Sequence, residues 1–308
     1  TLSIVLPIGL SFHTFQAMSY TIEVYRGNQK AEKHFGIYAL YVMFYPQLVA
    51  GPIERPQNVL PQLHKHHSFN YDRLISGLRL MMWGIFKKVV IADSFALIVN
   101  PFYNNVSDAS GWQLLLATYC FTIQIYCDFS GYSDIALGAA RIMGIDLMQN
   151  FNTPYLSKSI SEFWVRWHIS LSTWFRDYLY IPLGGNRSGK TKWIRNILIV
   201  FLISGFWHGA NYTFIIWGAL HAFYLIFARV TEKFRADFRI KVFGESASIL
   251  KYWDVFITFN LVAFAWIFFR ANSVSDSLII IQKISSAIVH GLSSVSYTHL
   301  TLPTNREV

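Results

Sequence analysis

Residues 193–229 read WIRNILIVFLISGFWHGANYTFIIWGALHAFYLIFAR: two apolar runs, 193–207 and 211–229, separated by a short turn. A helix that crosses the ~30 Å hydrocarbon core of a bilayer needs ~20 mostly apolar residues. Apolar runs with so few charges are typical of membrane helices. The stretch therefore predicts a helical hairpin in a membrane.

The overall composition also indicates a membrane protein. Of 308 residues, 53% are apolar and 14% are charged, whereas about a quarter of a soluble domain is charged. This excludes a disordered chain, a collagen and a coiled coil. The two cysteines, Cys120 and Cys127, are too few for a disulfide framework or a multi-cysteine metal site. Both lie in one apolar run, where we expect them to pack between helices.

The net charge of +9 would suggest a nucleic-acid partner on a soluble protein. Here the basic residues lie in short loops between apolar segments, so cytoplasmic loops explain the charge and no nucleic acid is expected. The basic loops 187–195 and 229–241 are therefore both expected on the cytoplasmic side. Residues 196–207 between them span only ~18 Å as a helix, which is too short to cross. The turn at 208–211 is thus expected inside the membrane.

Further apolar segments predict more membrane helices, and no β-alternation is sustained. The candidates are 1–22, 35–50, 74–100, 112–142 and 252–270, with 278–290 as the start of another helix. The expected fold class is all-α, a polytopic transmembrane helical bundle. Charges and prolines interrupt several segments, and backbone that leaves a helix at membrane depth must be buried or line a wet cavity. We therefore expect re-entrant and interfacial helices around a polar interior; the alternative places the charges at helix ends among lipid headgroups.

Separate predictions concern the two ends of the chain. Thr1 lies in an apolar stretch without an initiator methionine, so N-terminal helices are expected to be missing. Residues 1–290 are interpreted as one core with truncated C-terminal helices, and 291–308 as a tail of foreign appearance. Within that tail, 295–308 has neither a helical period nor an apolar face. The chain is thus interpreted as an incomplete fragment.

The first candidate for chemistry is His208, in the turn between the two apolar runs. A histidine at membrane depth is costly and by default suggests a functional site. Gly205 and Gly209 remove side chains around it, so that a substrate or another backbone can approach. Because histidine titrates near neutral pH, it is suited to take a proton from a hydroxyl. The alternative is a hydrogen-bonded histidine inside the bundle, with glycines that serve packing.

The second candidate is His168. A capping box at Ser159–Glu162 predicts a helix that begins there and ends at Pro182. Along it, polar residues form one stripe and aromatic residues another, and His168 lies with the aromatic residues. The many Trp and Tyr side chains suit a membrane–water interface. His168 is then either a packed, satisfied residue or a second functional histidine.

A third group lies in 126–134, where acids and hydroxyls interrupt an apolar run. Asp128, Ser130 and Tyr132 are candidates for lining a polar path or contacting the catalytic groups. The alternative is a helix break whose backbone is satisfied by Ser and Asp side chains. Lys87 and Lys88 similarly interrupt 74–100.

Three other patterns are weaker. Residues 51–56 predict a rigid turn in which Arg55 holds an anionic group, or pairs with Glu54 or lipid headgroups. Residues 184–191 satisfy the P-loop pattern, but no strand precedes them, so nucleotide binding is not expected. The remaining pattern is a histidine cluster interpreted as a solvated loop rather than a metal site: His64, His66 and His67.

Several stretches together carry a family resemblance. They are PIGLSF (7–12), FYPQLVAGPI (44–53), CDFSGYSD (127–134), WHISLS (167–172), RDYLYIPLGGN (176–186) and WHG (207–209). In this order they resemble the bacterial membrane-bound O-acyltransferases, nearest to those that O-acetylate alginate and more distantly to those that transfer D-alanine to teichoic acid. The resemblance covers most of residues 1–290.

The resemblance implies which residues form the site. His208, in Trp-His-Gly, corresponds to the essential histidine of the family, and His168 to its second catalytic position. The matching motifs also make the following residues candidates for lining the site: Asp128, Ser130, Tyr132, Trp207, Asn211, Arg176 and Asp177. The segment 182–187 belongs to the family pattern, so the P-loop match is accidental.

The expected function is acyl transfer, most simply acetyl transfer, across a bacterial inner membrane by a multi-pass enzyme. The donor would be a cytoplasmic thioester on coenzyme A or an acyl carrier protein. The acceptor would be a hydroxyl of an exported polysaccharide such as alginate, or of a periplasmic or extracellular partner protein that relays the group. His208 would act as general base, and His168 would orient the donor or stabilise the oxyanion. No metal or tightly bound cofactor is expected.

Two other classes of protein fit the same segments. Broken helices and polar groups at the midplane are also typical of transporters and flippases, although no inverted repeat is visible. A non-catalytic scaffold of a polysaccharide export complex is the third possibility. A transporter would not consume an acyl donor, and a scaffold would not depend on His208.

Overall fold

The computed structural model describes residues 10–48, 51–187, 189–243 and 249–300. These residues form helices joined by loops, and no strand occurs among them, which confirms the all-α fold class. The α-helices are α1 (Leu10–Tyr25), α2 (Phe35–Val42), α3 (Pro56–Leu63), α4 (Tyr71–Ile85), α5 (Asp93–Asn104), α6 (Gly111–Ile142), α7 (Ile160–Arg166), α8 (Ile169–Phe175), α9 (Lys190–His208), α10 (Tyr212–Val230), α11 (Glu232–Phe243), α12 (Ile249–Arg270) and α13 (Val274–Leu300). Shorter turns are the 3-10 helices η1 (Tyr45–Gln47) and η3 (Pro154–Leu156) and the π-helices η2 (Phe86–Ala92) and η4 (Arg176–Tyr180).

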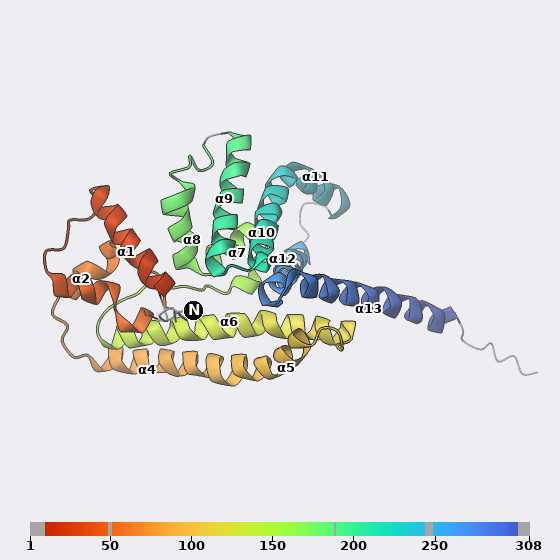
Figure 1. Cartoon of the computed structure of the whole chain (residues 1–308), viewed down its shortest axis with the longest axis horizontal. Helices are drawn as coiled ribbons and strands as arrows, with labels where there is room; N and C mark the ends of the chain where they lie inside the picture. Colours follow the sequence, from red (N-terminus) through yellow and green to blue (C-terminus); the bar gives the residue numbers. More distant parts are fainter. Residues whose placement is uncertain (1–9, 49–50, 188, 244–248, 301–308) are drawn as a thin grey trace, which may run out of the picture.

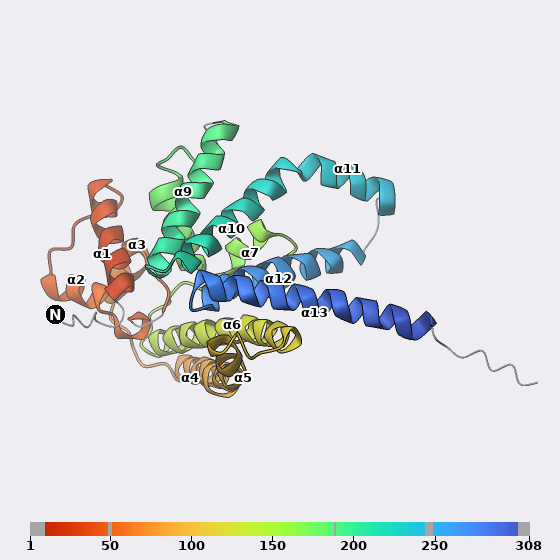
Figure 2. The same ribbon diagram turned by 45° about the vertical axis from the view of Figure 1, so that its right-hand side comes forward.

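Helix α6 lies in the middle of the molecule (Figure 1). The nearly continuous rod of α4, η2 and α5 runs along one side of it, and α7 to α10 lie on the other side. Figure 2 shows the same arrangement after rotation, with α12 and α13 beside α6 and with α1 to α3 at one end. The functional candidates of α7, α8 and α9 therefore lie over one face of α6.

The two long helical segments approach most closely at paired glycines. A Cβ atom on Gly77 would lie 2.7 Å from the carbonyl oxygen of Gly138, and one on Gly84 would lie 2.5 Å from that of Gly131. The two glycines on each helix are seven residues apart, so the two backbones meet on one face of each helix. Small residues that let backbones approach are typical of helix pairs in membranes.

The charges that interrupt these segments pair with one another. Lys87 Nζ lies 2.6 Å from an Asp134 oxygen and donates to Ser130 Oγ at 2.9 Å. Lys88 Nζ lies 2.8 Å from oxygens of both Asp128 and Asp93. Lys87 is buried, so its partners offset the cost of removing an ammonium group from water. These residues form an ionic cluster between η2 and α6.

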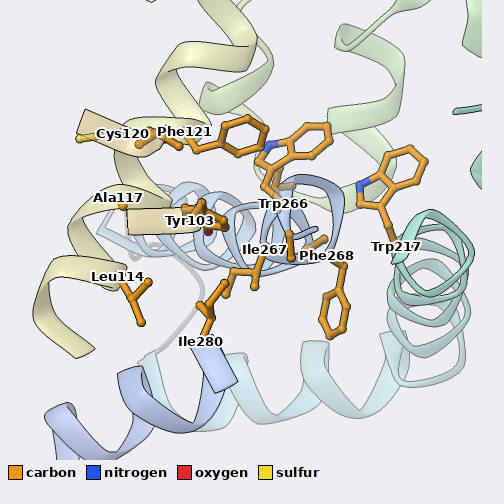
Figure 3. Close-up of a cluster of buried hydrophobic side chains, with 14 of the residues drawn as sticks. Tyr103, Leu114, Ala117, Cys120, Phe121, Trp217, Trp266, Ile267, Phe268 and Ile280 are labelled. Carbon is orange, nitrogen blue, oxygen red and sulfur yellow. The ribbon is translucent and has the colours of Figure 1, made fainter. Parts of the chain in front are cut away.

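The largest hydrophobic core lies where α6, α10, α12 and α13 meet (Figure 3). The rings of Trp217 and Trp266 stack with centroids 5.8 Å apart. Trp266 Nε1 donates to the Tyr155 hydroxyl at 3.2 Å, and that hydroxyl donates to the carbonyl of Thr122 at 2.6 Å. Cys120 and Cys127 of α6 are free and buried, as expected for packing residues.

The predicted hairpin of 193–229 is confirmed, because α9 ends at His208 and α10 begins at Tyr212. Helix α9 begins at Lys190, so it includes the basic residues that were expected to lie in the preceding loop. Among the described residues, two helices are long and apolar enough to cross a membrane, Tyr212–Val230 and Leu250–Arg270. The depth of the turn after His208 stays a prediction.

Two predicted segments differ from the structure. The helix expected over 35–50 is wrong, because α2 stops at Val42 and a 3-10 turn follows that contains Pro46, which cannot donate a helical hydrogen bond. The helix expected to start over 278–290 is longer, because α13 runs from Val274 to Leu300; the interpretation of the tail as foreign stays a prediction. Residues 1–9 and 301–308 lie outside the described residues.

The N-terminal helices are tied to α8 and η4 by polar contacts. Trp174 Nε1 donates to Ser19 Oγ at 2.9 Å, and an Arg55 nitrogen lies 3.2 Å from Asp177 Oδ2. The guanidinium group of Arg55 also lies over the ring of Tyr178. Arg55 therefore pairs with Asp177 rather than with Glu54, which is buried and accepts from Asn58 and the backbone of Met148.

The histidine cluster at 64–67 lies at the surface loops. His64 Nε2 lies 2.6 Å from an oxygen of Glu32, and His67 Nε2 pairs with the carbonyl of Gln62. Hydrogen bonds from the His34 backbone and from His64 hold the pKa of Glu32 below its usual value. These contacts accord with the interpretation of a solvated loop.

Candidate active site

The predicted helix from 159 to 182 begins as expected but is broken at His168. Ser159 Oγ accepts from the backbone N–H of Glu162 at 3.1 Å, and Glu162 accepts from the backbone of Lys158. Helix α7 then stops at Arg166, and α8 begins at Ile169. The expectation of one continuous helix is therefore wrong.

The break places His168 in a backbone conformation that side chains rarely adopt. Its φ of 44° and ψ of 54° are left-handed, which costs a non-glycine residue ~1–3 kcal/mol. The neighbouring loop before η3 offsets this cost, because the carbonyl of Asn150 accepts from Ile169 N–H at 2.9 Å. The side chain of Asn150 also accepts from Ser170 N–H at 3.3 Å.

The imidazole of His168 is buried among aromatic rings. Its centroid lies 4.6 Å from that of Phe129 and 6.5 Å from that of Trp207. Nδ1 contacts Asn150 Oδ1 at 3.1 Å, whereas Nε2 is buried with no hydrogen-bond partner among the described residues. A buried polar atom without a partner is costly, so a hydrogen bond to Nε2 from a bound molecule would be favourable.

His208 is the last residue of α9 and is half-buried. Aromatic rings surround it: the centroids of Trp207, Trp217 and Phe269 lie 4.7, 5.1 and 5.1 Å away. Among the described residues, none forms a hydrogen bond with the ring. The imidazole is thus held by packing, and no described residue engages either ring nitrogen.

Trp207 lies between the two histidines. Its ring is within 6.5 Å of His168 and 4.7 Å of His208, measured between centroids. Its indole Nε1 is buried and has no partner among the described residues. Three buried polar atoms without a partner among the described residues therefore accompany His208, on His168, Trp207 and Trp217.

A cavity of about 980 Å³ opens near this group. Its walls are formed by α7, α8 and η4 on one side and by α9, α10 and α11 on the other. The polar end carries Arg176, Lys190, Arg229, Glu232 and Arg235, and is therefore mainly basic. The apolar end is lined by Trp164, Leu171, Val200, Phe201 and Ser204.

The apolar end of the cavity lies one helical turn from both histidines. Ser204 lines the cavity, and His208 follows it by four residues on the same face of α9. Ser172 also lines the cavity, and its backbone N–H donates to the carbonyl of His168 at 2.9 Å. The two histidines are not among the residues that line the cavity, but each is connected to it through one of these serines.

Other predicted site residues lie elsewhere. Asp128, Ser130 and Tyr132 belong to the ionic cluster: Asp128 and Ser130 pair with the lysines, and Lys88 Nζ lies 6.0 Å from the Tyr132 ring. Two other residues of α6 lie at His168 instead. Phe129 packs against its ring, and Ser133 accepts from Asn150, which in turn pairs with His168. Phe129 and Ser133 are four residues apart and share one face of α6, whereas Ser130 and Asp134 share another, which faces the lysines of η2.

The remaining candidates have structural contacts. Arg176 lines the basic end of the cavity and pairs with Asp177 at 2.8 Å, and Asp177 also pairs with Arg55. Asn211 caps α10 by accepting from Thr213 N–H at 3.1 Å and donates to the carbonyl of Asn272 at 2.9 Å. Asn211 therefore fixes the turn after His208 to the link between α12 and α13.

The family model of the membrane-bound O-acyltransferases matches residues 34–271. The chain is 40% identical over 302 residues to the probable alginate O-acetylase of Pseudomonas aeruginosa, covering 97% of this chain and 55% of that protein. It is 38% identical over 327 residues to the peptidoglycan O-acetyltransferase of Helicobacter pylori, covering 98% and 60%. Against the teichoic acid D-alanyltransferase of Bacillus subtilis the identity is 30% over 278 residues, covering 86% and 69%. The chain thus spans about half the length of the first of these relatives.

Proposed function

The chain belongs to the membrane-bound O-acyltransferase family, and from this premise we propose that it transfers an acyl group, most simply acetyl, from a thioester to a hydroxyl. We propose a multi-pass location in a bacterial inner membrane. The observation that carries the proposal is His208, which has no hydrogen-bond partner among the described residues and lies one turn beyond a cavity with a basic end. Its ring is available to remove a proton at the point where a donor bound in the cavity would end.

The proposed reaction is a direct transfer. The acceptor's hydroxyl oxygen attacks the thioester carbonyl carbon while His208 takes the hydroxyl proton. The carbon–sulfur bond then breaks, the ester stays on the acceptor, and the leaving thiolate takes a proton from His208. General base catalysis typically contributes ~10²–10⁴-fold to such a step. The unpaired N–H of Trp207 is suited to bind the carbonyl oxygen as its negative charge develops.

The acceptor is proposed from the relatives and from the position of the basic loops. The printed names of the relatives refer to alginate, peptidoglycan and teichoic acid, which are polymers of the bacterial cell surface. A basic cytoplasmic end of the cavity suits a donor that enters from the cytoplasm. The acceptor hydroxyl is then on an exported polysaccharide or on a partner protein that relays the group.

The basic end of the cavity gives a testable donor site. Replacing both Lys190 and Arg229 by alanine removes two cations that are suited to phosphate groups of coenzyme A or of a carrier's pantetheine. We expect the KM for the thioester donor to rise about tenfold with kcat nearly unchanged, because exposed ion pairs contribute ~0.2–1 kcal/mol each. The measurement is initial rate against donor concentration at low and high salt.

The matched control is the double replacement Lys30→Ala and Lys33→Ala, which removes the same charge from an exposed loop outside the cavity. Its KM should stay at the wild-type value. The difference between the two variants should shrink in high salt, since salt screens exposed charges. Equal KM values for both double variants would place the donor elsewhere.

The function itself is tested by following the acyl group. Membranes containing the chain are incubated with acetyl thioester labelled on the acetyl group, and polysaccharide is then treated with mild base. We expect label in base-labile ester that is absent from membranes without the chain. Transport of the polysaccharide without consumption of the thioester would favour a transporter or flippase instead.

A further inference from the structure

The side chain of Asn150 is the polar link between His168 and the long helix α6. It is buried in the loop between α6 and η3. Its Oδ1 lies 3.1 Å from His168 Nδ1 and accepts from Ser170 Oγ at 2.9 Å, and its Nδ2 donates to Ser133 Oγ at 3.2 Å. All of its polar atoms thus have partners on named elements.

The backbone of Ser170 fixes which way the amide of Asn150 points. A backbone N–H is only a donor, and that of Ser170 lies 3.3 Å from the Asn150 side chain. The atom that faces it must therefore be the carbonyl oxygen and not the NH₂ group. Because Oδ1 only accepts, Nδ1 of His168 must carry the proton in their shared hydrogen bond.

The orientation of Asn150 has a consequence for the other nitrogen of His168. In a neutral imidazole one nitrogen carries the proton and the other a lone pair, so Nε2 is an acceptor. Nε2 is also the buried atom without a partner among the described residues. Its neighbours are the rings of Phe129 and Trp207, and neither forms a hydrogen bond with it, so Nε2 is free to accept one from a bound substrate.

We propose that Asn150 is a positioning residue that holds His168 with its proton on Nδ1, so that Nε2 accepts a hydrogen bond from a donor group of the bound acceptor other than the reacting hydroxyl. This inference rests on the proposed function and specifies the role of His168 in it. A lone pair cannot donate to an oxyanion, so oxyanion stabilisation falls to another donor. His168 instead orients the acceptor, while His208 removes the proton of the reacting hydroxyl.

Three variants separate positioning from structure. Asn150→Leu removes the acceptor; Asn150→Asp keeps it, with a negative charge; and Asn105→Leu makes the same change as the first at an exposed position outside the site. We expect Asn150→Leu to lower kcat at least about tenfold, since a wrongly held catalytic imidazole loses its function, with the donor KM nearly unchanged. Asn150→Asp should restore most of kcat, and Asn105→Leu should stay near wild type.

The pH profile gives a readout that a purely structural role would not change. A carboxylate beside His168 favours its protonated form, so the imidazole would lose its lone pair at a higher pH. The acid limb of kcat against pH should therefore move to higher pH in Asn150→Asp. Asn150→Asp with kcat as low as that of Asn150→Leu and an unmoved acid limb would overturn the inference.

Nitrogen-15 NMR of histidine-labelled chain in lipid tests the tautomer without any activity. The His168 signals are assigned by their absence in His168→Gln. We expect Nδ1 protonated and Nε2 unprotonated in the wild type, and loss of this preference in Asn150→Leu. An unprotonated Nδ1 in the wild type, or a wild-type kcat in Asn150→Leu, would contradict the proposal.

Different results would contradict the proposed acyl transfer and the proposed role of Asn150. If wild-type membranes form no ester, the proposed function is wrong, while the NMR tautomer still decides what Asn150 does. If His168→Ala retains full transfer but His208→Ala does not, the transferase proposal survives and the role of His168 and Asn150 is wrong.

Discussion

Replacement of His208 by alanine is expected to lower acyl transfer by about 10²–10⁴-fold, the range that general base catalysis typically contributes. The half-buried ring is packed against Trp207, Trp217 and Phe269 and makes no hydrogen bond with a described residue. Its removal therefore leaves no polar group unpaired, so the amount of folded protein in the membrane should change little. The measurement is base-labile ester per unit of membrane protein.

Two further variants make this result specific. His66→Ala removes an exposed histidine of a surface loop and should transfer at the wild-type rate. His208→Gln restores most of the side-chain volume without a basic ring and should remain as slow as His208→Ala. Wild-type ester in His208→Ala would refute the catalytic proposal and leave the transporter or the scaffold as the better explanation.

Gly218→Val should produce a large loss of stability, because it separates the helix that ends at His208 from its neighbour. A Cβ atom at Gly218 would lie 2.2 Å from the carbonyl oxygen of Phe201 on α9. A second close approach lies at Gly205, where a Cβ atom would lie 2.4 Å from the carbonyl oxygen of Phe214. The clash is with backbone, so no side-chain rotation relieves it. We expect the free energy of unfolding to fall by about 1–3 kcal/mol or more.

The same change should also reduce transfer, because α10 supplies Trp217 beside His208. Thermal unfolding in detergent and ester formation are measured on the same preparation. Gly27→Ala is the control, since nothing lies within 4 Å of a Cβ atom there and only the left-handed backbone, with φ of 75°, opposes it. A Gly218→Val protein as stable as Gly27→Ala would show that the two helices do not need this contact.

The fold was predictable where local sequence determines it. The capping residue Ser159 and the turn at 208–211 are local signals, and both appear as helix ends in the structure. The pairing of Lys87 with Asp134 was not predictable, because it depends on the register of two helices whose contacting residues lie far apart in sequence. The seven-residue spacing of Gly77 and Gly84, and of Gly131 and Gly138, is the sequence signal that would have suggested this register.

For the candidate site, too, residues in local motifs were predictable, and features that depend on tertiary contacts were not. Motifs pointed to His168 and His208, and the structure brings Trp207 between them. The break at His168 was missed because a left-handed residue between two helices is held by tertiary hydrogen bonds rather than by local preference. Asn150 was missed for a related reason: it lies 18 residues before His168, in a loop without a pattern of its own.

The paired glycines between α4 and α6 also affect how the molecule would respond to the thickness of its bilayer. That the segment 112–142 crosses a membrane stays a prediction; if it does, α6 with its 32 residues is about 48 Å long, well beyond the ~30 Å of hydrocarbon. A helix this long adjusts by tilting. Sliding of α4 along α6 by one residue would bring side chains against the carbonyl oxygens that now face glycine. The two helices should therefore tilt together as one rigid unit. A thinner or thicker membrane would then reorient Phe129 and the neighbouring His168, while α4 and α6 stay in contact.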